Sequence, residues 1–329
     1  MDFEYGLKPE PAHERTDRES FADVSMSRSS GLELIPKGAP SAEALNMDID
    51  QLLADMLMQP GGFEDWQVRM VMWTMAIQNA FEKDNYAKGL PGFRTATYGF
   101  FDPETEMDGF GVIAYVAPSL DGPPRGEFHW VNVDQESFRI MVRPAEWTLH
   151  APPNPTMGTA TCWAQSRKPR LKNKPAMLTA KHVVGNRTIG SNVPLTSGRG
   201  TLLDLAPEGI DAALVRVSQS IWPGSPNPLQ CQRFIAQWTD VDVYTASGSF
   251  STKITEVNSG RGSLDPNIPL RVFLANPGQS GDSGALVLDT SGNGIGLYMG
   301  EMTTQANVQE GFCQHLAQVE DSMAVDLFL

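Results

Sequence analysis

Residues 277–287 of this 329-residue chain read PGQSGDSGALV, and this stretch decides the fold. Its glycines place Ser283 on a tight turn, directly ahead of an apolar segment typical of a β-strand. Upstream, the run MLTAKHVV at 177–184 contains His182, and the run GIDAALVRV at 209–217 contains Asp211 near its start. A histidine, an aspartate and a serine, each at the edge of an expected strand, are the groups that an acyl-transfer triad needs.

The three side chains have complementary chemistry. A serine hydroxyl is a weak nucleophile at neutral pH, so a neighbouring base must accept its proton during the attack. Histidine suits this role, and a carboxylate behind the imidazole fixes its tautomer and stabilises the imidazolium. Backbone N–H groups of Gly281 and Ser283 can stabilise the oxyanion that forms. We therefore expect His182, Asp211 and Ser283 to be catalytic, with Gly281 and Ser283 forming an oxyanion hole.

The blocks TAKH at 179–182, DAALV at 211–215 and GDSG at 281–284 resemble the signature blocks of chymotrypsin-like, trypsin-fold serine proteases. The order His, Asp, Ser is similar to that family and differs from the order Ser, Asp, His of α/β-hydrolases. Val183 stands where secreted members carry a cysteine, and the interval between the first two blocks is short. The chain thus resembles the compact intracellular bacterial or viral type, with an extra N-terminal region.

This resemblance implies two six-stranded antiparallel barrels, with the triad in the cleft between them. It also implies that the strand at 298–300 binds the substrate as an added β-strand, so Tyr298, Met299 and Gly300 are expected substrate-binding residues. An apolar or small substrate residue before the cleaved bond is expected, while Glu301 leaves a basic one open. Arg139-Ile140 faintly resembles the activation-cleavage site of secreted relatives, but a plain strand is the favoured interpretation.

Three alternatives stay open. Asp204 lies seven residues before Asp211 and competes for the role behind the histidine; Asp211 is preferred because it opens an apolar run. A protease-fold binding module with a catalytically silent triad is the rival function from another class. An esterase of the α/β-hydrolase type would use Ser283 with Asp289 and His315, but a Gly/Asn turn follows the serine where that fold requires a helix.

The composition narrows the function classes. Lys and Arg number 25 against 39 Asp and Glu, so the formal charge of −14 disfavours a nucleic-acid partner. No apolar run is long enough for a membrane span, and residues 1–5 lack a signal-peptide profile, so a cytoplasmic location is expected. Three cysteines without a CxxC spacing indicate neither a zinc site nor a disulfide framework. We expect no cofactor, no metal and a protein or peptide substrate.

The chain divides into three parts by pattern. Residues 1–40 are rich in Glu, Arg, Ser, Pro and Gly and predict a disordered tail. Residues 41–145 combine two helical stretches with short apolar runs and predict an α+β accessory region, a possible contact for a regulatory partner. Residues 146–329 carry many short strand-like runs between turn residues and predict the protease domain. The expected fold class is mainly β, a double antiparallel β-barrel with an N-terminal α+β accessory region.

Overall fold

The computed structural model describes residues 34–84, 86–101, 109–118, 129–149, 158–172, 174–195, 198–218, 226–258, 270–304 and 309–329. Of the expected tail, residues 1–40, the first 33 lie outside the described part of the chain. The described part is mainly β, with one ten-stranded and one six-stranded sheet. None of its helices is long and apolar enough to cross a membrane.

The C-terminal barrel is a closed ring of antiparallel pairings. Its strands are β10 (Asp240–Thr245), β11 (Gly248–Val257), β12 (Arg271–Leu274), β13 (Leu286–Asp289), β14 (Gly294–Thr304) and β15 (Gln309–His315). Hydrogen bonds run from β10 to β11, β12, β15, β14, β13 and back to β10. Inward-facing aliphatic side chains, among them Val243, Val272 and Val287, fill its centre, as the period-two pattern of its strands requires.

The second unit is a six-stranded antiparallel sheet. Its strands, in the order in which they pair, are β16 (Val325–Phe328), β5 (Ala160–Ser166), β6 (Ala176–Thr179), β9 (Ala213–Arg216), β8 (Gly198–Leu205) and β7 (Asn192–Leu195). The helix α7 (Leu316–Met323) buries Leu316, Val319 and Met323 in the core of this unit. The mainly β fold class with an antiparallel barrel, expected from the sequence, is therefore confirmed: the C-terminal barrel closes, while the described pairings of the second sheet run from β16 to β7.

The N-terminal region is α+β, as its patterns predict. It contains α2 (Ala42–Leu45), α3 (Ile49–Leu57), α4 (Asp65–Lys83), α5 (Tyr86–Gly89), β1 (Phe93–Phe100), β2 (Phe110–Val116), β3 (His129–Val133) and β4 (Glu136–Leu149). The long helix α4 begins with a reciprocal capping box between Glu64 and Gln67 and carries Lys83 in its last turn. Its buried face, including Trp73 and Ile77, packs on the sheet of β1, β2 and β3.

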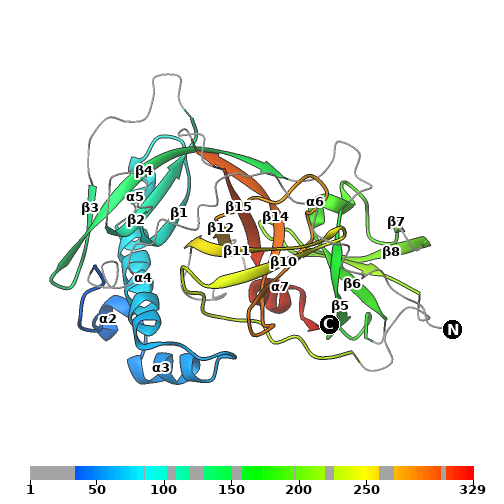
Figure 1. Cartoon of the computed structure of the whole chain (residues 1–329), viewed down its shortest axis with the longest axis horizontal. Coiled ribbons are helices and arrows are strands. Elements are labelled where there is room, and N and C mark those ends of the chain that lie inside the picture. The colour runs from blue at the N-terminus through cyan, green and yellow to red at the C-terminus, as the bar shows by residue number, and fades with distance from the viewer. Residues whose placement is uncertain are drawn as a thin grey trace.

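Strand β4 joins the N-terminal region to the C-terminal barrel (Figure 1). Its first half, 139–144, pairs in parallel with β2, and its second half, 145–149, pairs antiparallel with β14. The expected domain boundary at 145/146 therefore falls inside a continuous strand. Ile140 is buried in this strand, so Arg139-Ile140 is part of the sheet in this structure.

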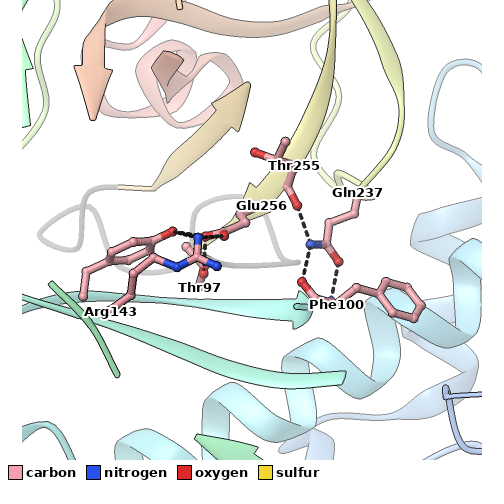
Figure 2. A network of polar contacts seen from close by, with 7 residues as sticks. Thr97, Phe100, Arg143, Gln237, Thr255 and Glu256 are labelled. Carbon is pink, nitrogen blue, oxygen red and sulfur yellow. Dashed lines mark hydrogen bonds and ion pairs between the residues drawn. The ribbon is translucent and has the colours of Figure 1, made fainter. Parts of the chain in front are cut away.

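A buried polar cluster lies at the same junction. Glu256 on β11 accepts hydrogen bonds from Thr97 Oγ1 at 2.6 Å and Tyr115 Oη at 2.5 Å. Arg143 Nη1 on β4 forms an ion pair with Glu256 Oε1 at 3.0 Å (Figure 2). Because these partners come from β1, β2 and β4, the one carboxylate ties three N-terminal strands to the barrel.

In two segments the structure differs from the element that the apolar pattern favours. The apolar run 176–184 reads as one strand, but β6 ends at Thr179 and residues 181–184 form the short helix α6 (Lys181–Val184). The tail from Val319 reads as a helix, but α7 ends at Met323 and β16 follows. Pairing of β16 with β5 satisfies the backbone groups of the tail, which a sequence pattern alone does not reveal.

Candidate active site

His182 lies in the single-turn helix α6, just after the end of β6. Ala180 precedes the turn in an extended conformation, and Gly185 ends it with φ of 62°, a value in the left-handed region that favours glycine. The turn places His182 beyond the end of β6. Only 14% of its side chain is exposed.

Asp211 binds this histidine at two points. Its Oδ2 lies 2.5 Å from His182 Nδ1, and its Oδ1 accepts a hydrogen bond from the His182 backbone N–H at 2.9 Å. Burial raises the pKa of Asp211, but the hydrogen bonds and charge of His182 outweigh this, so its pKa is lowered overall. The carboxylate is thus held ionised, and it fixes the orientation of the imidazole ring.

Asp204 has a different partner. Its Oδ2 lies 2.6 Å from Lys168 Nζ, and its side chain is 6% exposed. Of the two aspartates that compete from the sequence, the structure therefore places Asp211 behind His182 and Asp204 in an ion pair with Lys168.

Ser283 lies on the turn between β12 and β13. Gly281 and Gly284 have φ of +100° and +90°, values that other residues adopt only with strain. Asp282 lies buried behind the turn, where its Oδ2 accepts a hydrogen bond from Gln279 N at 2.8 Å. Neither Gly281 N nor Ser283 N donates a hydrogen bond to any residue that the structure describes. These two amides are the expected oxyanion donors.

The Ser283 hydroxyl is turned toward β14. Its Oγ donates to the Met299 carbonyl oxygen at 2.7 Å, and the residue is fully buried. Nε2 of His182 is buried and makes no hydrogen bond within the described residues. The imidazole nitrogen that would accept a proton is therefore unoccupied, while the hydroxyl binds a carbonyl oxygen.

Thr159, just ahead of β5, holds the serine turn against the histidine strand. Its N–H donates to the Ser283 carbonyl at 2.8 Å, and its Oγ1 donates to the Gly281 carbonyl at 3.0 Å. Its own carbonyl accepts from Thr179 Oγ1, at the end of β6, at 2.7 Å. A Cβ at Gly284 would lie 2.7 Å from that hydroxyl. The serine turn and the strand leading to His182 are therefore in direct contact.

The backbone of the expected substrate-binding strand already has protein partners. Tyr298 N donates to Ala285 O and Tyr298 O accepts from Gly284 N, both at 2.8 Å. Met299 O binds the Ser283 hydroxyl, and Gly300 pairs with Leu149 of β4. Met299 is therefore in direct contact with Ser283. Tyr298 is fully buried, and its backbone binds Gly284 and Ala285 of the serine turn.

Sequence reasoning did not single out Thr159 or Arg271. Arg271 Nη2 donates to the Gly209 carbonyl at 3.2 Å, two residues before Asp211. Burial lowers the pKa of Arg271 to about 10, and its positive charge lowers the pKa of Asp211. A threonine or an arginine outside a motif carries no signal for such a role, because the contact exists only once the barrels are closed.

Neither Asp289 nor His315, which the esterase alternative combines with Ser283, hydrogen-bonds to the Ser283 hydroxyl in the described structure. The carboxylate of Asp289 binds the side-chain amides of Gln232 and Asn293, and His315 is buried where β15 meets α7. No group of three His, Cys, Asp or Glu side chains suited to a metal ion occurs in the described part of the chain.

Comparisons with known proteins find similarity only among solved structures. No family model matches the chain, and no curated protein matches it. Among solved structures, the Nocardiopsis protease NAPase is 18% identical over 53% of this chain and 95% of its own, with a TM-score of 0.39. Thermobifida fusca protease A is 16% identical over 52% and 91%, with a TM-score of 0.39. Cellulomonas bogoriensis chymotrypsin is 17% identical over 52% and 89%, with a TM-score of 0.36.

Proposed function

We propose that the chain is a serine endopeptidase that hydrolyses peptide bonds through an acyl-enzyme. Ser283 is the nucleophile, His182 the general base and then the general acid, and Asp211 the residue that orients the imidazole. The amides of Gly281 and Ser283 stabilise the oxyanion. The observation that carries this proposal is the His182–Asp211 pair, with contacts of 2.5 Å and 2.9 Å, beside a turn whose two amides are unbonded in the described structure.

The first step requires a rotation of the serine side chain. The hydroxyl leaves the Met299 carbonyl, and Oγ turns toward His182 Nε2, which is buried and without a hydrogen-bond partner in the described structure. An unpaired buried nitrogen costs about 1–3 kcal/mol, so a new hydrogen bond there offsets the loss of the old one. As Oγ attacks the substrate carbonyl, its proton passes to Nε2 and the electron pair of the carbonyl moves onto its oxygen.

The imidazolium then gives this proton to the leaving amine, which departs with its bonding electrons. Water then attacks the acyl carbon and gives a proton to His182 Nε2. The bond from this carbon to Ser283 Oγ breaks, the acid product leaves, and the imidazolium returns the proton to Oγ. The protein substrate supplies an extended segment, because the groups that face it are backbone atoms of a strand and a turn. The N-terminal region of this chain regulates or targets the peptidase activity.

A binding module with a silent triad is the second candidate. It is favoured by the Ser283–Met299 hydrogen bond, because a serine held in that position cannot attack a carbonyl group. In this case the fold would bind peptides through the same strand without turnover.

Peptide turnover by matched aspartate variants separates these candidates. We expect Asp211→Asn to lower kcat/KM by a factor on the order of 10³–10⁴, because the wrong tautomer of His182 is then stabilised. The control Asp204→Asn removes a buried carboxylate of the same sheet that binds Lys168, and it leaves kcat unchanged. Ser283→Ala abolishes turnover. Equal effects of the two aspartate changes, or turnover by Ser283→Ala, contradict the proposal.

A further inference from the structure

Strand β14 changes its partner at the serine. Over residues 296–303, with an irregularity between Tyr298 and Gly300, one edge of β14 bonds to β15. The other edge bonds to β13 only over 294–297, and it bonds to β4 over 300–304. Between these two stretches lies Met299, whose carbonyl holds the Ser283 hydroxyl. The edge that leaves β13 at the candidate nucleophile is therefore the edge that β4 covers.

This edge is the one that a substrate strand needs. A peptide that adds to a sheet edge binds through backbone hydrogen bonds, and to reach Ser283 it must pair with β14 next to Met299. The pairing partners in the structure are Gly300 with Leu149, Met302 with Trp147 and Thr304 with Ala145. β4 is antiparallel to β14, so its chain runs from residue 145 to 149 toward the serine.

The covering strand is firmly attached on its N-terminal side. Its residues 139–144 pair with β2, and Arg143 forms the buried ion pair with Glu256. Ala145 is buried in a cluster with Met299, Met302 and Phe312. Glu146, by contrast, is exposed. The strand is therefore held by the N-terminal sheet and reaches the barrel as the end of that sheet.

We propose that residues 145–149 act as a built-in competitive inhibitor, which covers the β14 edge until this segment is displaced. The inference rests on the proposed function, since it assigns the edge to the substrate of that site. It assigns a role to the continuity of β4, which pairs first with β2 of the N-terminal region and then with β14 of the barrel. The main-chain hydrogen bonds of one strand exchange for those of another, so displacement replaces the bonds it breaks.

A reversible cross-link tests this proposal in the full chain. Glu146 and Thr303 are directly opposed in the register, and opposed residues of an antiparallel pair lie within about the reach of a disulfide. The variant Glu146→Cys with Thr303→Cys locks β4 in place when oxidised and frees it when reduced. The control Asp242→Cys with Ser251→Cys locks an opposed pair between β10 and β11, away from the edge. A third variant, Thr148→Pro, weakens the β4 pairing, because proline has no backbone N–H.

Two readouts keep the inference separate from the proposed function. Binding of fluorescein-labelled casein is measured by anisotropy in the Ser283→Ala background, which needs no catalysis. Labelling of the parent serine by a small fluorophosphonate, which needs no strand edge, reports the triad alone. We expect the locked chain to bind casein at least about tenfold more weakly than the Thr148→Pro chain, a difference of ~1.4 kcal/mol, while the control lock changes nothing.

Equal binding of casein by the locked and Thr148→Pro chains, or equal lack of binding, overturns the inference. Failure of the fluorophosphonate to label any form overturns the proposed function instead, and the casein comparison still decides whether β4 covers a peptide site.

Discussion

At the scale of single residues, Tyr298 sets the space beside the candidate nucleophile. Its Oη accepts a hydrogen bond from Gly278 N at 2.6 Å. A Cβ at Gly278 would lie 3.1 Å from the ring, and one at Gly311 would lie 3.0 Å from its other edge. The ring thus fills the gap between the turn that precedes Ser283 and strand β15. If the proposed function holds, we expect a substrate side chain directed toward this ring to be small.

We predict that Tyr298→Ala widens this preference. The ratio of kcat/KM for a substrate with Phe before the cleaved bond to that for a substrate with Ala should rise by about tenfold or more, because one aromatic ring is removed from the space. Tyr298→Phe, which keeps the ring and loses only the hydroxyl, serves as the matched control and should retain the preference for Ala. An unchanged ratio in Tyr298→Ala would show that the ring does not face the substrate.

At the scale of elements, the junction of β15 and α7 contains a buried titratable group. His315 ends β15 and precedes α7, and it is 3% exposed. Burial, and then the charge of Arg233, lower the pKa of His315 to about 4. The imidazole is therefore neutral in the folded state over the range in which an unfolded histidine becomes charged.

This difference makes stability depend on pH. The folded-state pKa is below the unfolded value of about 6.5, so the unfolded state binds the proton more readily. The contribution is complete above that value and is lost as the pH falls from about 6.5 toward 4, to a total of roughly 3 kcal/mol. Urea unfolding at pH 7.5 and pH 5 should show a larger loss in the parent than in His315→Gln. Equal losses in the two proteins would exclude this role.

The same elements show what a sequence pattern can and cannot reveal. Strand β10 is readable because the buried Val241 and Val243 alternate with the more exposed Asp240, Asp242 and Tyr244. Val325–Phe328 reads as part of a helix, since a short apolar run fits either period, and only its pairing with β5 makes it a strand. The pairing of β4 with β14 leaves no local signal either, because it joins residues about 150 positions apart.

At the scale of the whole molecule, polar clusters join the N-terminal region to the barrel. Glu256 binds Thr97, Tyr115 and Arg143 (Figure 2). Burial, and then the charge of Glu256, raise the pKa of Tyr115 well above its usual range, so the phenol stays a hydrogen-bond donor. Near them, Gln237 accepts from Phe100 N at 2.7 Å. These contacts connect the N-terminal sheet directly to the barrel.

We predict that Glu256→Gln lowers the free energy of unfolding by about 3–5 kcal/mol, because it removes the buried carboxylate that lies 3.0 Å from Arg143 Nη1. The double variant Glu256→Met with Arg143→Met removes both charges and should be much closer to the parent in stability. The comparison is made by thermal unfolding of all three proteins. A double variant as unstable as Glu256→Gln would show that the loss of charge pairing does not account for the lower free energy of unfolding.

The residues of the candidate site could be predicted from the sequence, but their arrangement could not. His182, Asp211 and Ser283 stand out in the sequence because acyl transfer requires these residue types in turns beside strands. Their assembly depends on contacts such as Thr159 with Ser283 and Thr179, which form only when the barrels pack. The rotamer of Ser283 depends on the Met299 carbonyl, and no sequence pattern encodes a choice between two acceptors.

Covalent labelling by a fluorophosphonate, with the modified residue located by mass spectrometry, tests the central claim most directly. The account predicts one adduct, on Ser283, which His182→Gln reduces by a factor on the order of 10³ or more because the hydroxyl then has no base. Labelling on another residue, or labelling of Ser283 that is indifferent to the loss of His182, would contradict it.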